Sequence, residues 1–120
     1  MENKKLQQIV ETEAYLDDLS KVIYKGQDEI ELRKGIREEI FKNPLIGKVI
    51  PRTGGVRKFR YAAPGRGKSG GYRIIYYFYD EHNPVFLLKM YTKSFTENLT
   101  SKEENFLFTC AKHLKKTFKA

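Results

Sequence analysis

The sequence of 120 residues contains a single cysteine, Cys110. One cysteine cannot form an internal disulfide, and a metal site built on several cysteines is excluded as well. Such low cysteine usage is typical of proteins that work in a reducing compartment. We therefore expect a cytoplasmic protein without a disulfide scaffold.

Long apolar runs are also missing from the sequence. No stretch reaches the roughly 18 apolar residues that a transmembrane helix needs. The first residues, MENKKLQQIVETEAY, lack the hydrophobic core of a signal peptide. Both absences favour a soluble protein that stays in the cytoplasm and has no contact with a membrane.

Acidic residues are absent from one long segment, residues 48–79. The flanking segments carry net charges that cancel, so the formal net charge of +8 resides in this segment. Charge concentrated in this way points to a polyanion or to an acidic protein as partner. The basic residues of the segment are Lys48, Arg52, Arg57, Lys58, Arg60, Arg66, Lys68 and Arg73.

Histidine is scarce too, and neither His82 nor His113 lies in this basic segment. A pair of histidines acting as acid and base is therefore not indicated. A metal site needs clustered carboxylates, histidines or cysteines, and residues 48–79 contain none of these. We expect no metal and no other cofactor, so that any chemistry of this segment is metal-free.

Enough apolar residues remain to form one folded domain over residues 1–120. Hydrophobic residues make up 40% of the chain and aromatic residues 13%, which is too much for a disordered protein. The length is that of a single domain with a small core.

Apolar spacing predicts the secondary structure of this domain. A helical hairpin is expected over residues 12–43, with Thr12 and Asp28 as N-caps. Residues 6–11 are either a short strand or an extension of the first helix. Strands are expected at 56–62, 72–79 and 85–93, with loops at 45–55 and 64–71, and a helix begins at Thr100. The order β-α-α-β-β-β-α predicts an α+β fold, with helices packed on a small antiparallel sheet.

One string in the basic segment resembles a nucleotide-binding loop. Residues 62–69, AAPGRGKS, fit a relaxed Walker A pattern. A real phosphate-binding loop opens a helix, whereas the residues that follow, GGYRIIYYFY, predict a strand. Nucleotide hydrolysis is therefore not expected, although Arg66 and Lys68 with the free amides of a glycine-rich loop could hold a phosphate.

The most informative residues are three cations on the predicted strands. Lys58 and Arg60 share one face of their strand, and Arg73 lies near the start of the next strand. Lys93, at the end of the third strand, could join them, together with Tyr91 on the same face. Converging cations can bind a phosphodiester, and they can also neutralise the charge that develops when it is cleaved. The residue types are compatible with two functions. One is binding of a polyanion without chemistry, and the other is cleavage of a phosphodiester.

Three segments closely resemble the HigB branch of the RelE/ParE toxin superfamily. They are NPLIGKVIPRTGGVRKFR, GRGKSGGYRIIYYFYD and FLLKMYTKSFTENLTSKEE, in sequence order. The resemblance implies the toxin of a type II toxin–antitoxin pair. Such toxins enter the ribosomal A site and cut the mRNA without a metal, through attack of the 2′-hydroxyl on the adjacent phosphorus. The implied partners are mRNA on the ribosome and an acidic, HigA-like helix-turn-helix antitoxin.

The resemblance also implies roles for individual residues. Lys58 and Arg60 would supply the base and a charge-stabilising group, and Arg73 would hold the phosphate. Lys93 is the candidate acid for the leaving 5′-oxygen. Where RelE carries a further aromatic residue, this chain has Leu99 or a neighbour, so Tyr91 is the candidate for base stacking. The expected contacts to RNA are Arg57, Arg66, Lys68 and Tyr91.

Two other functions remain open on the same fold. One is a ParE-like toxin that inhibits DNA gyrase and is not a nuclease. The other is an RNA-binding domain without cleavage activity. The concentrated cations Lys58, Arg60, Arg73 and Lys93 favour the ribonuclease.

Overall fold

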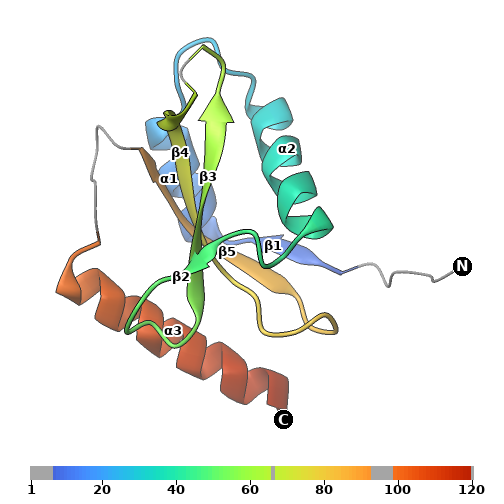
Figure 1. Ribbon diagram of the computed structural model, residues 1–120, viewed down its shortest axis with the longest axis vertical. Coiled ribbons are helices and arrows are strands. Elements are labelled where there is room, and N and C mark those ends of the chain that lie inside the picture. Colours follow the sequence, from blue (N-terminus) through green and yellow to red (C-terminus); the bar gives the residue numbers. More distant parts are fainter. Residues whose placement is uncertain (1–6, 66, 93–98, 120) are drawn as a thin grey trace, which may run out of the picture.

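The computed structural model describes residues 7–65, 67–92 and 99–119, apart from the side chains of Lys68, Ser69 and Lys119. The described part folds as an α+β domain in which three helices pack on one sheet (Figure 1). The elements are β1 (Ile9–Glu11), α1 (Glu13–Val22), α2 (Glu29–Lys42), β2 (Lys48–Val49), β3 (Val56–Ala63), β4 (Gly67–Tyr77), β5 (Val85–Thr92) and α3 (Ser101–Lys119).

The five-stranded sheet has the order β1-β5-β4-β3-β2. The predicted α+β class and the meander β3-β4-β5 are confirmed, but the sheet is mixed, because β1 pairs with β5 in parallel. The other pairs are antiparallel. A parallel pairing between residues some 75 positions apart depends on the intervening helical hairpin, which local sequence patterns do not encode.

Two predicted loops also contain strand residues. β2 lies inside the expected loop 45–55 and pairs with β3. β4 begins at Gly67, so the expected loop 64–71 is reduced to the turn around Pro64 and Gly65. The start of β4 was not predicted as a strand, because this segment is rich in glycine, which has a low strand propensity.

The helices cover both faces of the sheet and form two separate cores. On one face α1 and α2 bury Tyr15, Leu32 and Ile36 against β4, where Ile74 and Tyr76 point toward them. On the other face α3 packs against alternate residues of β4, with Leu107 and Ala111 in contact with the cluster of Val56, Ile75 and Tyr77. The continuous apolar run of β4 follows from this burial on both faces.

The predicted N-caps of the helical hairpin are confirmed. The Thr12 side chain accepts a hydrogen bond from the Tyr15 amide, and its hydroxyl donates to the Leu87 carbonyl at 2.7 Å. Asp28 accepts from the Glu31 amide at 3.0 Å. Each cap satisfies an amide that has no partner within its helix. Thr12 additionally fixes the start of α1 to β5.

Tyr76 holds the loop that leads into β2. Its hydroxyl donates to the Pro44 carbonyl at 2.6 Å and accepts from the Gly47 amide at 2.9 Å. Arg57 donates to the Gly47 carbonyl at 2.6 Å. A Cβ at position 47 would lie 2.8 Å from the Tyr76 ring, so glycine is needed for this close approach. The three contacts fix where β2, and with it Lys48, lies.

Tyr76→Phe is therefore expected to lower the free energy of unfolding by about 1–3 kcal/mol, because the Gly47 amide is left buried without its acceptor. Urea denaturation of both proteins measures the difference. Tyr79→Phe is the matched control, since the Tyr79 hydroxyl makes no hydrogen bond within the described residues. Equal stability of the Tyr76→Phe variant and the wild type would contradict a structural role for this hydroxyl.

Candidate nucleic-acid interface

Of the cations predicted to converge, Lys58, Arg60 and Arg73 lie on one face of the sheet, whereas Lys93 lies outside the described residues. Arg60 of β3 is the direct cross-strand neighbour of Arg73 on β4, which in turn faces Tyr91 on β5. Lys58 faces Lys48 of β2 on its other side. Directly opposed side chains share a face of a sheet, with their Cβ atoms about 4.5–5.5 Å apart. We call Lys48, Lys58, Arg60 and Arg73 the cationic face.

Two of these cross-strand pairs, Arg60 with Arg73 and Lys48 with Lys58, join side chains of like charge. Like charges directly opposite each other destabilise a sheet. Folding alone would favour an apolar or oppositely charged partner at these positions. Two such pairs in adjacent rows are instead what a binding site for an anion requires, because the anion relieves the repulsion.

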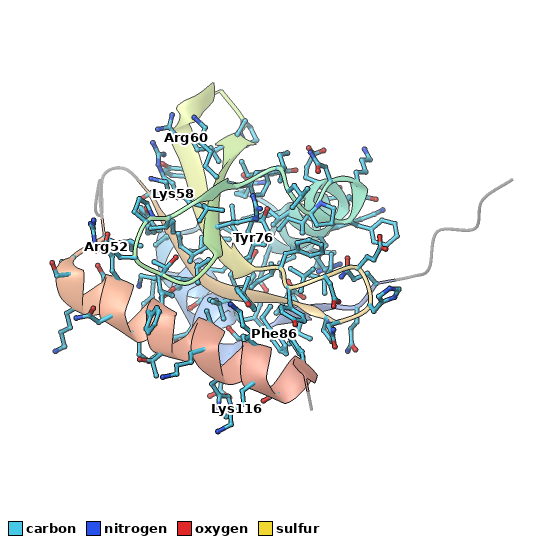
Figure 2. The ribbon with its side chains drawn as sticks, turned by 60° about the horizontal axis from the view of Figure 1, so that its bottom comes forward. Arg52, Lys58, Arg60, Tyr76, Phe86 and Lys116 are labelled. Carbon is cyan, nitrogen blue, oxygen red and sulfur yellow. The ribbon has the colours of Figure 1, made fainter. Side chains whose placement is uncertain are left out.

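The members of the cationic face differ in exposure. Arg60 is exposed and Lys58 is half-buried, and both side chains extend from β3 toward solvent in Figure 2. Arg73 is only 2% exposed, and its Nη1 donates to the Gly71 carbonyl at 3.3 Å. Lys58 and Arg60 are therefore the cations that a ligand meets first, while Arg73 is held in place within the sheet.

Other cations near this face are neutralised by acidic partners. Arg52 forms an ion pair with Glu104 of α3 at 3.2 Å. Lys89 of β5 lies 3.9 Å from Asp18 and 3.7 Å from Glu103. Neither Lys58 nor Arg60 forms an ion pair within the described residues. Among the described residues, no acidic side chain therefore balances the charge of Lys58 and Arg60.

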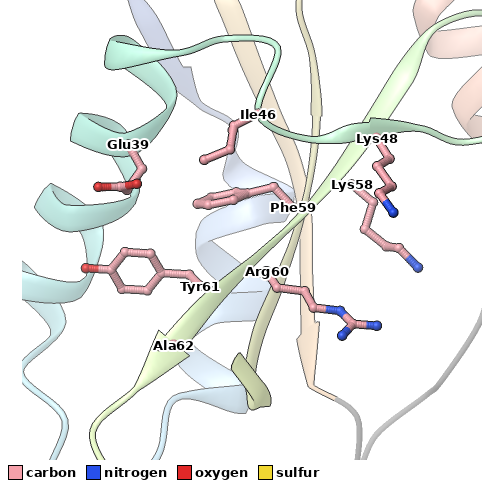
Figure 3. Close-up of a pocket in the computed structure, with 8 residues that line it drawn as sticks. All are labelled: Glu39, Ile46, Lys48, Lys58, Phe59, Arg60, Tyr61 and Ala62. Carbon is pink, nitrogen blue, oxygen red and sulfur yellow. The ribbon is translucent and has the colours of Figure 1, made fainter. Parts of the chain in front are cut away.

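A groove with a cavity volume of about 770 Å³ runs along the cationic face and past β3. Figure 3 shows Lys48, Lys58 and Arg60 on one side of the β3 ribbon and Phe59, Tyr61 and Glu39 on the other. A second groove of about 490 Å³ lies between β2 and the start of α3, and it shares Lys48 and Lys58. Both grooves therefore open onto these two lysines.

Two of the residues expected to contact RNA have other surroundings in the structure. Tyr91 is 2% exposed and packs in the core under α3, so its ring is not accessible for stacking. Arg57 is the cross-strand neighbour of Tyr76 and binds the Gly47 carbonyl, on the face opposite Lys58. Arg66 and Lys93 lie outside the described residues, and of Lys68 only the backbone, in β4, is described.

Lys48 is the member of the cationic face that the sequence did not single out. Its place depends on β2, a two-residue strand that lacks any periodic pattern of its own. The one sequence feature that could have indicated a role for Lys48 is its position as the first basic residue of the acid-free segment 48–79.

The Walker-like string runs into β4 and not into a helix, as predicted. His82 and His113 are exposed and lie away from the cationic face. The described residues hold no group of three or more His, Cys, Asp or Glu side chains suited to a metal ion. Among the described helices, none is long and apolar enough to span a membrane.

Comparisons with known proteins identify the family of the chain. A family model described as the RelE toxin of the RelE/RelB toxin–antitoxin system matches residues 47–120, which include the whole cationic face. The fold is similar to that of a mutant of the Escherichia coli toxin RelE in the free state, with a TM-score of 0.53 and 21% identity. That match covers 76% of this chain and 87% of the other.

A second similar structure is the toxin–antitoxin complex RelBE2 from Mycobacterium tuberculosis. The TM-score is 0.50 and the identity 22%, over 72% of this chain and 96% of the matched chain. At such identities the likeness establishes the fold, and the family match establishes the relationship. The chain belongs to the RelE family of toxins from toxin–antitoxin systems.

Proposed function

We propose that this toxin is a ribosome-dependent, metal-free endoribonuclease of the HigB type that cleaves translated mRNA and thereby stops protein synthesis. The observation that supports it most is the pair of like-charged cross-strand contacts, Arg60 with Arg73 and Lys48 with Lys58, beside an open groove. RNA offers the phosphates that such a face requires.

In the proposed reaction the 2′-hydroxyl of a nucleotide attacks the adjacent phosphorus, and the 5′-oxygen leaves. The products are a 2′,3′-cyclic phosphate and a free 5′-hydroxyl. Negative charge grows on the phosphate oxygens in the transition state, where Arg60 and Arg73 stabilise it electrostatically. By the HigB resemblance, one of Lys58 and Arg60 is the base and the other stabilises charge; with Arg60 in the second role, Lys58 removes the proton from the nucleophile, and Lys93 protonates the leaving oxygen.

The proposed partners follow from the same charge distribution. The cationic face binds mRNA in the ribosomal A site, and the net charge of +8 favours an acidic antitoxin. A HigA-like helix-turn-helix protein encoded beside the toxin fits this requirement. Such a toxin works in the cytoplasm, where mRNA is translated.

Primer extension on an mRNA in a purified translation system tests the proposal. Wild-type toxin is expected to create new 5′ ends within the translated region. The same mRNA without ribosomes should remain intact. The upstream fragments should carry 2′,3′-cyclic phosphates. Absence of new ends on translated mRNA, together with stabilised gyrase–DNA cleavage complexes, would instead indicate a ParE-like toxin.

A further inference from the structure

The groove beside the cationic face extends across a strand edge that has no neighbour. β2 pairs only with Arg57 and Lys58, so on the side of β3 away from β4 no described strand lies beside the segment from Phe59 to Ala63. The gap between this edge and α2 forms the second half of the 770 Å³ groove. Its lining there is Glu39 and Ile46 on one side and Phe59 and Tyr61 on the other.

The two halves of the groove differ in chemistry. Lys48, Lys58 and Arg60 form a cationic half, and the side chains of Phe59 and Tyr61 point the opposite way, toward α2 (Figure 3). The two rings pack edge to face, with centroids 6.3 Å apart, and Tyr61 is the one that a ligand can reach, because Phe59 is only 6% exposed. A nucleotide has the same division, with an anionic phosphate at one end and a flat aromatic base at the other. Unpaired RNA bases are commonly held on aromatic side chains in this way.

Tyr61 and Glu39 supply polar groups to the aromatic half. A Cβ at Gly35 of α2 would overlap the Tyr61 hydroxyl, so this hydroxyl lies against α2. Glu39 is one helical turn further on and occupies the same side of the helix. Burial, and after it the negative charges of Glu39, Glu38 and Glu31, raise the pKa of Tyr61. The hydroxyl therefore keeps its proton at neutral pH and can donate a hydrogen bond.

The Glu39 carboxylate is available to accept hydrogen bonds from a ligand. It is half-buried in the groove wall, and among the described residues its side chain has neither an ion-pair nor a hydrogen-bond partner. A carboxylate accepts two parallel hydrogen bonds from neighbouring N–H groups. Guanine is the RNA base that offers two adjacent donors, N1–H and N2–H, with an acceptor, O6, beside them.

We propose that this groove is a guanine-binding subsite, in which Glu39 accepts from N1–H and N2–H, Tyr61 donates to O6, and the attached phosphate lies on Lys58 and Arg60. The proposal rests on the proposed function in one respect, namely that the polyanion on the cationic face is RNA. It makes Glu39 the residue that determines base preference. Adenine and cytosine would place a ring nitrogen acceptor against the carboxylate, and uracil would offer only N3–H, with a carbonyl oxygen against the second carboxylate oxygen.

The experiment is an NMR titration of the full chain with GMP, AMP, CMP and UMP, each of which carries a phosphate and one base. GMP is expected to bind about tenfold more tightly than the other three, since one bidentate contact gives discrimination of that order. Resonances of Glu39, Phe59 and Tyr61 should shift. Glu39→Gln should abolish the advantage of GMP, because an amide presents a donor where guanine needs an acceptor.

Glu38→Gln is the matched control. It removes the same charge from the preceding position of α2, whose side chain does not line the groove. It should keep the preference for GMP. Equal binding of the four nucleotides, or a GMP preference that survives Glu39→Gln, would overturn the subsite. Shifts confined to residues that do not line the groove would overturn it as well. The titration needs no ribosome, so failure of mRNA cleavage would count against the nuclease alone.

Discussion

Replacement of Arg60 by alanine is expected to slow cleavage of ribosome-bound mRNA by about 100- to 1000-fold. Arg60 is an exposed member of the cationic face and lies directly opposite Arg73. A preorganised charged donor at the scissile phosphate contributes this much, because it acts where negative charge develops. Single-turnover cleavage of a defined mRNA on stalled ribosomes measures the rate.

The fold should remain intact in this variant. The Arg60 side chain makes no hydrogen bond or ion pair within the described residues, and removing it relieves the repulsion with Arg73. Thermal unfolding of Arg60→Ala should therefore match or slightly exceed that of the wild type. Loss of activity would then come from the site and not from unfolding.

Lys116→Ala is the matched control for Arg60→Ala. Lys116 is exposed on α3 and extends from the opposite side of the molecule, so the control removes one positive charge far from the cationic face (Figure 2). Its cleavage rate should stay close to that of the wild type. If both variants lost activity equally, net charge would explain the effect and no specific role for Arg60 would remain.

A double variant with Lys58→Ala tests whether the two residues act together. Residues that serve one transition state show strongly non-additive effects, so the second substitution should cost much less than it does alone. Additive losses would mean that Lys58 and Arg60 act in separate steps, for example in docking and in chemistry.

The strand that carries these residues could be predicted from the sequence because strand side chains alternate with a period of two. Alternation alone placed Lys58 and Arg60 on one face and Phe59 and Tyr61 on the other, and the structure agrees. The helix caps at Thr12 and Asp28 were equally predictable, because a cap depends on contacts three residues away.

What the sequence could not show depends on packing between distant segments. β1 joins β5 in parallel only after the helical hairpin has formed, and β2 is held by Tyr76 through the loop contacts to Pro44 and Gly47. Alternation also cannot tell which part of a face a helix covers. α3 covers Tyr91 but leaves Arg60 exposed, although both lie in one cross-strand row.

Glu39 is a groove residue that could not be predicted from the sequence for the same reason. On the helix it is one of several acids, and its mixed surroundings in sequence predict an ordinary solvated surface. Only the position of α2 across the gap from the unpaired edge of β3 makes it part of a groove with the cationic residues.

Gly71→Ala is expected to be the most destabilising conservative change near the site. A Cβ at position 71 would lie 3.0 Å from the Cα of Ala62 and closer still to the Tyr61 carbonyl oxygen. Both are backbone atoms of β3, so neither can swing away as a side chain would. Overpacking of this kind costs about 1–3 kcal/mol or more. Differential scanning calorimetry should show a lower Tm, by about 4 °C for each kcal/mol lost.

The change should also disturb the site, because Gly71 lies at the irregular step in the pairing of β3 with β4. The register shifts between Tyr61 and Ala63, just beyond the pair Arg60 and Arg73. Moving the strands apart at Gly71 would separate these two cations, and Gly71 also provides the carbonyl that binds the Arg73 side chain. Cleavage should therefore fall at temperatures where the variant is still folded.

Gly35→Ala provides the contrast that makes this prediction specific. At position 35 the new Cβ meets only the far end of the Tyr61 side chain, which can rotate away. Alanine also favours the helix by about 1 kcal/mol over glycine, which offsets the cost of moving the ring. The Tm of Gly35→Ala should thus stay near that of the wild type. If Gly71→Ala were equally harmless, the contact between β3 and β4 at this step would not set the register on which the pairing of Arg60 with Arg73 depends.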